Sequence, residues 1–541
     1  MRFVLVVFFA LSLMAADDKV ADKALCTPPV DKASPTLPAK LMAGMGELSF
    51  PITTSNPEAQ KFFNQGVAQM HSFWAREAER SFLQAAALDP EAPMPWWGVA
   101  MVAVGDYRPQ FQMEAAEEVA GKSLSTNPRV KTAVERAGKL AAAPGKATDL
   151  EKLYIASIVA RRNIKSKTPT DDYTAALRSL IQKHPKEVEA QLYLALQTMR
   201  GFVLPEKTAR PGTMESVNIL RRLRQEFPQH PGVHHFIIHA WEGSTFAEDA
   251  EVSARKYAAL APGIPHALHM PGHIFSQTGK WTEAQHYFEL CRVKEVEFMD
   301  ADQLYGSGHH GHNVHYLASS FSFNGDVDKA LEMATGLLKY EQTPREREQL
   351  DAYTSAYRQA QFALIRTLVQ HERWDAILDG KTIPVIDKPR PRAWRHWALA
   401  LAHVAKGEVT AAQAERDLMD QAVEDLVKMT FDKQSPELRV AQMELRGYLQ
   451  IAGGKVDQGF HTLQQASDRE QRLRYMEPPW YPRPVAEAQG WAAVRHGRVP
   501  DAKRAFARAL EQYPGSARAV SGQREIERLK TAGSAAAADA Q

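Results

Sequence analysis

The sequence predicts an all-α protein built from repeated pairs of antiparallel helices. Two observations carry this prediction. Apolar residues recur at helical spacing over residues 56–530, in segments rich in alanine and poor in β-branched runs. Small, aromatic and proline residues also recur at fixed places within a unit of about 34 residues.

The unit is clearest at residues 59–92. There Gly66 stands at place 8, Ala78 at place 20, Phe82 at place 24 and Pro90 at place 32. Small residues let two helices approach closely, an aromatic ring fills the space between them, and proline ends the second helix. Several of these places are matched in four further units, which span residues 231–264, 265–298, 311–344 and 483–516.

This pattern resembles that of the tetratricopeptide repeat family over residues 56–530. The resemblance implies a right-handed superhelix, or α-solenoid, of antiparallel helix pairs. The first helix of each pair would line a concave groove that binds a peptide, a protein partner or another ligand. Beyond the array, we expect residues 531–541 to form a disordered tail.

The N-terminal residues predict a signal peptide over residues 1–16. Arg2 precedes an apolar run from Phe3 to Leu13, and small residues follow before Asp17. The run is too short to span a bilayer, so we expect cleavage and a periplasmic or secreted chain with no transmembrane segment. Residues 17–55 form a proline-rich leader or linker, which could fold back along the groove.

Charge and motif content exclude several classes of function. The chain has 66 basic and 64 acidic residues in dispersed positions, which gives no support for a nucleic-acid surface. No P-loop, HExxH pair, G-x-S-x-G elbow or C-x-x-C-H haem site occurs. Export would permit a disulfide between Cys26 and Cys291, but the helical setting of Cys291 favours a small core residue that faces away from the groove.

More than half of the 19 histidines lie in the three stretches "PGVHHFIIHAWEGS", "PHALHMPGHIFSQTG" and "GHHGHNVHYLASS". They recur in phase with the repeat, at places 2, 5 and 9 of the first helix of each unit. Spacings of three, four and seven residues put side chains on one face of a helix. In the tetratricopeptide family these places point into the groove, so the predicted cluster comprises His235, His239, His266, His269, His273, His312 and His315.

Such a cluster indicates a transition-metal site. Protonated imidazoles repel one another and neutral ones oppose their lone pairs, whereas a copper, zinc or iron ion binds neutral imidazole favourably. The residues expected to orient the rings from behind are Glu242, Asp249, His309 and His310. The alternative is a groove wall of hydrogen-bonding histidines that holds no metal.

The strings "HFIIHA", "HALHMPGHI" and "HNVHYL" also resemble segments of uncharacterised exported bacterial tetratricopeptide-repeat proteins, as does "YMEPPWYPRP" at residues 475–484. This resemblance implies that the histidine stretches form one site and implies no activity. Aromatic and basic residues could add a ligand surface in the groove, namely Phe63, Trp97, Trp480, Tyr481 and Arg483.

Three functions are consistent with these patterns. The first is an exported protein that binds a ligand or partner in its groove and carries a histidine-ligated metal. The second is a metalloenzyme, an oxidase, oxygenase or hydrolase, in which the same histidines leave a coordination position open. The third is a metal-free scaffold for assembly of an envelope complex.

Overall fold

The computed structural model describes residues 38–113, 126–301, 308–340, 355–429 and 435–539. The described residues are all-α apart from one short antiparallel hairpin, in which Phe202 pairs with Ala209 and Val203 with Thr208. The predicted signal peptide, residues 17–37 of the leader and Cys26 lie outside the described residues.

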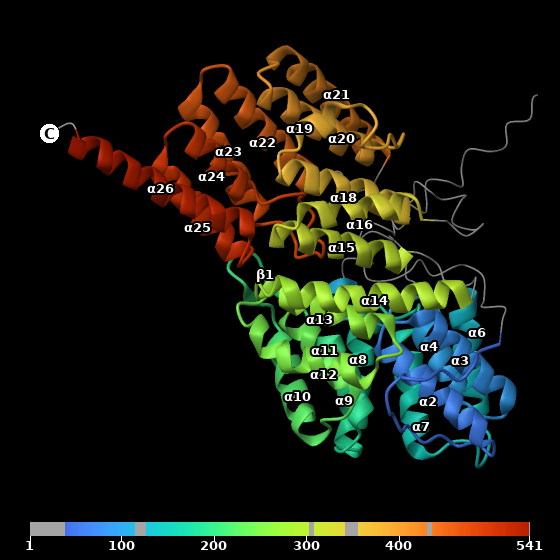
Figure 1. Cartoon of the computed structure of the whole chain (residues 1–541). Coiled ribbons are helices and arrows are strands. Elements are labelled where there is room, and N and C mark those ends of the chain that lie inside the picture. The colour runs from blue at the N-terminus through green and yellow to red at the C-terminus, as the bar shows by residue number, and fades with distance from the viewer. Residues whose placement is uncertain (1–37, 114–125, 302–307, 341–354, 430–434, 540–541) are drawn as a thin grey trace, which may run out of the picture.

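The elements follow one another as antiparallel neighbours along a curved array (Figure 1). In the first half they are α2 (Pro57–His71), α3 (Ala75–Leu88), α4 (Met94–Val102), α6 (Pro128–Ala141), α7 (Asp149–Arg161), α8 (Pro169–Lys183), α9 (Val188–Thr198), β1 (Phe202–Val203), β2 (Thr208–Ala209), α10 (Thr213–Glu226), α11 (Pro231–Trp241), η2 (Ala247–Ala250), α12 (Glu251–Leu260), α13 (Pro265–Gln277) and α14 (Trp281–Ala301). In the second half they are α15 (Gly308–Asn324), α16 (Val327–Leu338), α18 (Ala356–Gln370), α19 (Trp374–Leu378), α20 (Pro389–Ala405), α21 (Val409–Met429), α22 (Pro436–Ala452), α23 (Val456–Glu470), α24 (Val485–Arg495), α25 (Val499–Gln512) and α26 (Ala517–Asp539).

Three consecutive helix pairs form the centre of the array, and each matches a predicted unit. They are α11 with α12, α13 with α14, and α15 with α16. Pro231 and Pro265 occupy the first turn of α11 and α13, where the missing amide hydrogen costs no hydrogen bond. The three histidine stretches therefore lie on α11, α13 and α15, the first helices of neighbouring pairs.

The small and aromatic places of the repeat contact each other as the pattern predicts. A Cβ atom added to Gly66 would lie 2.7 Å from the Phe82 ring, and one added to Gly272 would lie 2.4 Å from the Phe288 ring. The rings of Phe82 and Phe288 are fully buried. The absence of a side chain at place 8 therefore sets how closely the two helices of a pair approach.

Gly490→Ala is expected to destabilise the protein by about 1–3 kcal/mol, because the new methyl would lie 2.6 Å from the buried Phe506 ring and over-pack the contact. Chemical denaturation followed by circular dichroism measures this change. The matched control is Gly336→Ala in α16, where nothing lies within 4 Å of the new Cβ. There the higher helix propensity of alanine should raise stability slightly, and equal effects at the two positions would contradict the packing argument.

The described part of the leader packs against the array instead of extending into solvent. The Gly263 amide donates to the Gly44 carbonyl at 2.8 Å, and a Cβ at Gly263 would lie 2.2 Å from a backbone oxygen, so only glycine allows this approach. Phe50 is buried, with its ring 5.5 Å from that of Phe63 and 5.9 Å from that of Trp97. This segment thus covers the first repeats.

Residues near the C-terminus return to the middle of the chain. The Trp281 indole donates to the Pro514 carbonyl at 2.9 Å, and the Gln277 amide donates to the Tyr475 hydroxyl at 2.6 Å. Figure 1 shows one end of the red region close to the green helices, whereas α26 runs outward to the C-terminus. The array therefore closes on itself beside the histidine-bearing helices.

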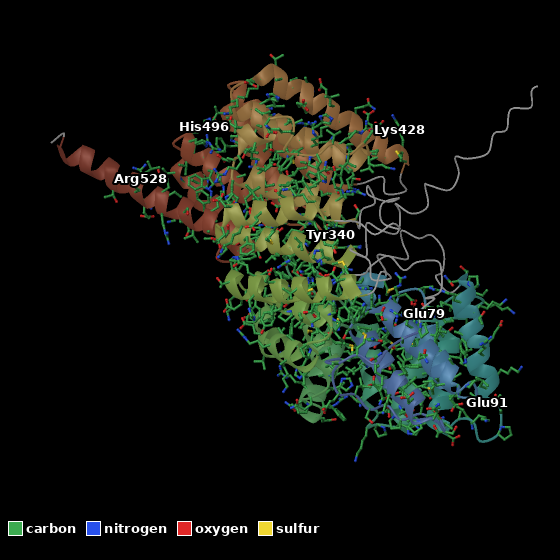
Figure 2. The ribbon with its side chains drawn as sticks, turned by 45° about the vertical axis from the view of Figure 1, so that its right-hand side comes forward. Glu79, Glu91, Tyr340, Lys428, His496 and Arg528 are labelled. Carbon is green, nitrogen blue, oxygen red and sulfur yellow. The ribbon has the colours of Figure 1, made fainter. Side chains whose placement is uncertain are left out.

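The surface carries dispersed charge of both signs. Glu91, Lys428 and Arg528 lie on the outside, each with about two-thirds of its side chain exposed (Figure 2). Among the described residues, no helix combines the length and the apolar composition that crossing a membrane requires. Helix α26 continues to Asp539, through a segment for which the sequence predicted a disordered tail, because its alanine-rich composition favours helix.

Candidate metal centre

Six of the seven predicted histidines form two neighbouring groups of three in the interior. The first histidine set consists of His235 and His239 on α11 with His266 on α13. The second histidine set consists of His269 and His273 on α13 with His312 on α15. No side chain of either set is more than 5% exposed.

The Nε2 atoms of the first histidine set point at one another. His235 Nε2 lies 3.0 Å from His239 Nε2 and 3.1 Å from His266 Nε2. Ligand nitrogens around a tetrahedral zinc ion lie about 3.3 Å apart, as follows from Zn–N bonds of 2.0–2.1 Å. These two spacings match ligands of one ion, and the ligand atoms of all three histidines lie within 4.8 Å of one another.

The opposite edges of these rings are held by hydrogen-bond acceptors. His235 Nδ1 contacts the His71 carbonyl oxygen, and His239 Nδ1 lies 2.7 Å from Glu242 Oε2. These oxygens only accept, so each Nδ1 carries the hydrogen and each Nε2 presents a lone pair. Two lone pairs facing each other at 3.0 Å repel unless a cation lies between them, and this arrangement is the usual one behind metal-bound imidazole.

His266 is supported in the same way by a chain of two side chains. Its Nδ1 lies 3.4 Å from His309 Nε2, and His309 Nδ1 contacts the Glu295 carboxylate. His310 Nδ1 lies 3.3 Å from the same carboxylate. Both histidines predicted to support the site thus lie behind it, with His309 touching a ring of the first set.

The second histidine set repeats this construction. His269 Nε2 lies 2.7 Å from His273 Nε2 and 3.2 Å from His312 Nε2. His269 Nδ1 lies 2.7 Å from Asn313 Oδ1, and the Asn313 amide nitrogen donates to the Phe288 carbonyl, which orients the amide oxygen toward the ring. His269 Nε2 therefore also presents a lone pair.

Glu242 connects the two sets. Its Oε2 accepts from His239 Nδ1, and its Oε1 lies 2.8 Å from His273 Nδ1. Burial opposes ionisation, but these two imidazoles hold the pKa of Glu242 well below its usual range. The carboxylate is therefore charged at neutral pH and orients one ring of each set.

Protonation differs among the rings. Burial, followed by neighbouring imidazoles, holds the pKa values of His235, His266, His269 and His312 well below the usual range, so these rings are neutral and can act as ligands at pH 7. For His273, burial is outweighed by carboxylates that raise its pKa to about 10. A proton on His273 can therefore bridge to His269 in place of an ion.

Two predicted site residues lie elsewhere. His315 faces α18, where its Nδ1 lies 2.7 Å from Gln359 Oε1, because the turn of α15 that reaches the second set carries His312. Asp249 lies on η2 and pairs with Arg221 at 3.1 Å, with about half of each side chain exposed. Of the two predicted carboxylates, only Glu242 contacts the histidines.

Four of the five predicted groove residues are buried instead. The rings of Phe63 and Trp97 lie in the core under Phe50. The Tyr481 hydroxyl and the Arg483 guanidinium both contact the buried carboxylate of Glu444. These residues fill the interior because Phe50 of the leader packs on Phe63 and Trp97, and residues 471–484 pack into the array. The sequence left undecided whether the leader folds back along the groove.

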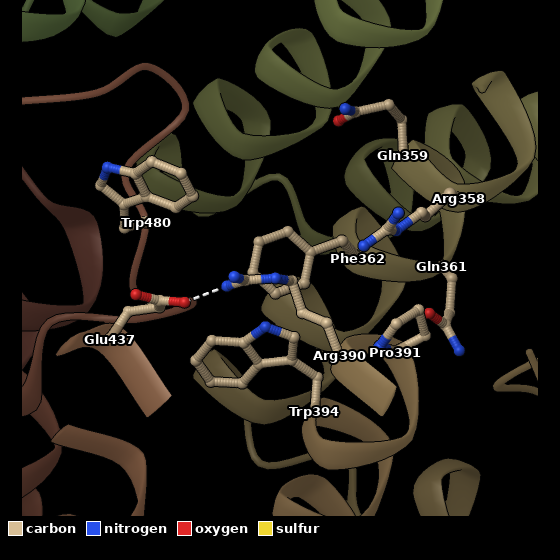
Figure 3. Close-up of a pocket in the computed structure, with 9 residues that line it drawn as sticks. All are labelled: Arg358, Gln359, Gln361, Phe362, Arg390, Pro391, Trp394, Glu437 and Trp480. Carbon is tan, nitrogen blue, oxygen red and sulfur yellow. Dashed lines mark hydrogen bonds and ion pairs between the residues drawn. The ribbon is translucent and has the colours of Figure 1, made fainter. Parts of the chain in front are cut away.

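Trp480 is the exception, since it is half-buried at the edge of a small pocket (Figure 3). Phe362 and Trp394 contribute two further rings, and Arg390 pairs with Glu437 across the pocket. Gln359, which holds His315, also lines it.

Sequence reasoning missed three acidic residues of this region. Glu477 Oε2 lies 2.7 Å from His273 Nδ1, and its only signal was the stretch "YMEPPWYPRP". Glu189 lies between His71 and His230, with distances of 2.6 and 3.0 Å. Glu295 lies on α14 and had no signal.

Cys291 is buried, as expected of a core residue, and forms no disulfide within the described residues, but it does not face away from the site. Its sulfur, a Glu295 oxygen and a His309 nitrogen lie within 4.8 Å of one another. The prediction that the cysteine points elsewhere was therefore wrong. The reason is that α14 packs along α13 and α15 and presents one side to His309.

Comparison with known proteins bears on the fold. The family profile described as "Tetratricopeptide repeat" matches residues 488–516, which include Gly490 and Phe506 of a predicted unit. Residues 488–516 are therefore a tetratricopeptide repeat. No curated protein matches the sequence of this chain.

Solved structures that resemble this chain do so at low sequence identity. The human IFIT1 dimer with m7Gppp-AAAA is 11% identical, covering 88% of this chain and 91% of that chain, with a TM-score of 0.34. Yeast Tom70 is 10% identical over 88% and 90% of the two chains, with a TM-score of 0.26. The APC/C hetero-tetramer Cut9–Hcn1 is 12% identical over 86% and 76%, with a TM-score of 0.29. Nothing about this chain's ligands follows from these similarities.

Proposed function

We propose that this tetratricopeptide-repeat protein binds a divalent transition-metal ion through the first histidine set. The supporting observation is the geometry of His235, His239 and His266, whose Nε2 atoms converge while an acceptor or a further histidine holds each Nδ1. Rings fixed from behind in this way pay little further ordering cost when an ion binds.

Imidazole nitrogen as the sole donor suits copper, zinc or iron. Repeat arrays of this kind also present surfaces to proteins or ligands, so the metal would be held by a protein that has a binding role as well. Residues 1–16 predict export, which would place this activity in the periplasm or outside the cell.

The test is elemental analysis of the mature protein purified without a polyhistidine tag or chelator. We expect at least one ion per chain in the parent and the loss of one in His235→Ala/His239→Ala. The matched control is His286→Ala/His461→Ala, which removes two exposed histidines and should retain all metal. A correctly folded parent without metal would refute the proposal and leave the scaffold function.

One observation favours a metalloenzyme as the second candidate. The first set supplies three protein ligands, the number that catalytic sites use while a fourth position stays open to water or substrate. Cobalt-loaded protein should therefore change its visible absorption when azide is added. An unchanged spectrum would indicate a closed site and exclude this candidate.

A further inference from the structure

We propose that the second histidine set binds a second ion beside the first, so that the protein holds two adjacent metal sites whose ligands are joined by hydrogen bonds to Glu242. This inference rests on the proposed metal binding at the first set. It concerns His269, His273 and His312.

The second set is the first set displaced by one repeat. His235 and His269 are 34 residues apart in the sequence, as are His239 and His273, and each pair lies at the same two places of its unit. The third ligand is at place 2 of the following unit in both cases, His266 for the first set and His312 for the second. Because the histidines stand at the same places in successive units, the arrangement that brings three imidazoles together in the first set also does so in the second.

The two sets are adjacent. The rings of His266 and His269, one from each set, lie 6.0 Å apart between centroids with their planes at 23°. Each oxygen of Glu242 holds a ring of a different set. Binding at either set therefore positions a ligand of the other.

The buried charge also fits two cations. Three buried carboxylates surround the sets: Glu242 contacts both, Glu477 contacts His273, and Glu295 contacts His309. Within the described part of the chain, their ion-pair partners are imidazoles and include no lysine or arginine. With all the imidazoles neutral, one divalent ion would leave part of this charge uncompensated, and either a second ion or a proton on His273 would offset it.

Glu477 gives the second set a feature that the first lacks. Glu477 lies in the segment of residues 471–484. Its carboxylate contacts the Tyr475 hydroxyl from the same segment and the Gln277 amide at the end of α13. The carboxylate therefore lies against His273 with its position fixed. A proton shared by His269 and His273 is the competing occupant of this set, and metal stoichiometry distinguishes the two.

The experiment loads the parent and three variants with Cu²⁺, removes unbound ion and measures copper per chain. We expect about two ions in the parent, about one in His235→Ala/His239→Ala, about one in His269→Ala/His273→Ala, and none in the quadruple variant. If the parent binds one ion and each of the two double variants binds none, the protein has a single site. That result would refute the second site, and the proposal that the protein binds a metal would stand. No ion in the parent would refute the proposed function itself.

Electron paramagnetic resonance tests separately whether the two bound copper ions lie next to each other. Two Cu²⁺ ions held at neighbouring sites interact through dipolar coupling, so the parent should show a broadened spectrum with a half-field line, and each double variant should show neither. An unbroadened spectrum without a half-field line from a parent with two ions would refute adjacent sites. If a double variant fails to fold by circular dichroism, His269→Gln/His273→Gln keeps the site polar and provides the same comparison.

Discussion

Glu242→Gln should weaken metal binding at both histidine sets by about 10–100-fold, the effect expected when a carboxylate behind a ligating imidazole is removed. The carboxylate accepts from His239 in one set and from His273 in the other. An amide can accept from one Nδ1–H but presents its NH₂ group to the other, so one ring loses its acceptor. The ring that keeps its hydrogen bond now faces a neutral oxygen instead of a charged one, so it is held less firmly as well. Competition with a chromophoric chelator measures both affinities.

The matched control is Asp249→Asn, the other carboxylate that the sequence suggested. Asp249 pairs with Arg221 at the surface, so its removal should leave both affinities unchanged. A uniform loss in both variants would point to altered folding instead of altered ring orientation. No loss in Glu242→Gln would contradict the bridging role.

Arg483→Met is expected to lower the free energy of unfolding by about 3–5 kcal/mol, because it leaves a buried charge without its partner. Arg483 Nη2 lies 3.0 Å from Glu444 Oε1, with the side chains 4% and 0% exposed. Although burial opposes the charge, this carboxylate raises the pKa of Arg483 above its usual range. Equilibrium denaturation in urea measures the loss.

The control for this prediction is Arg495→Met. Arg495 pairs with Glu372 at 3.1 Å, but 49% of its side chain is exposed, so solvent screens the interaction and about 1 kcal/mol or less should be lost. The double variant Arg483→Met/Glu444→Leu should recover much of the stability, because it removes both buried charges. Equal losses in Arg483→Met and Arg495→Met would contradict the role of burial.

The fold could be predicted because the repeat records contacts between neighbours in the sequence. Gly66 and Phe82 touch across one helix pair, and the same two places touch again at Gly272 and Phe288. The two residues of such a contact are 16 positions apart, and the contact recurs along the chain. The sequence therefore shows a periodic pattern that can be recognised without a structure.

The histidine sets could be predicted only in part. Helical spacing placed His235 with His239 and His269 with His273, since four residues separate ring neighbours on one face. Which ring of the next helix completes each set depends on how successive helix pairs rotate. That rotation brings His312 to the second set and turns His315 toward α18.

The remaining errors concern contacts between distant parts of the chain. Glu477 reaches His273 across some 200 positions, and Phe50 covers Trp97 from outside the repeats. Neither leaves a periodic trace. The places of residues in the repeat therefore could not decide whether the groove is open or is filled by a segment that does not repeat.

The return of residues near the C-terminus to α13 and α14 has a consequence for how the protein unfolds. In an open array each repeat depends on its two neighbours, so the ends fray independently and melting spreads unit by unit. Here the bonds from Trp281 to Pro514 and from Gln277 to Tyr475 join positions more than 190 apart. Fraying of α25 would break contacts made by the middle of the chain, which links the stability of the last repeats to that of the histidine-bearing ones. The repeats are therefore expected to unfold together in one cooperative transition instead of one after another.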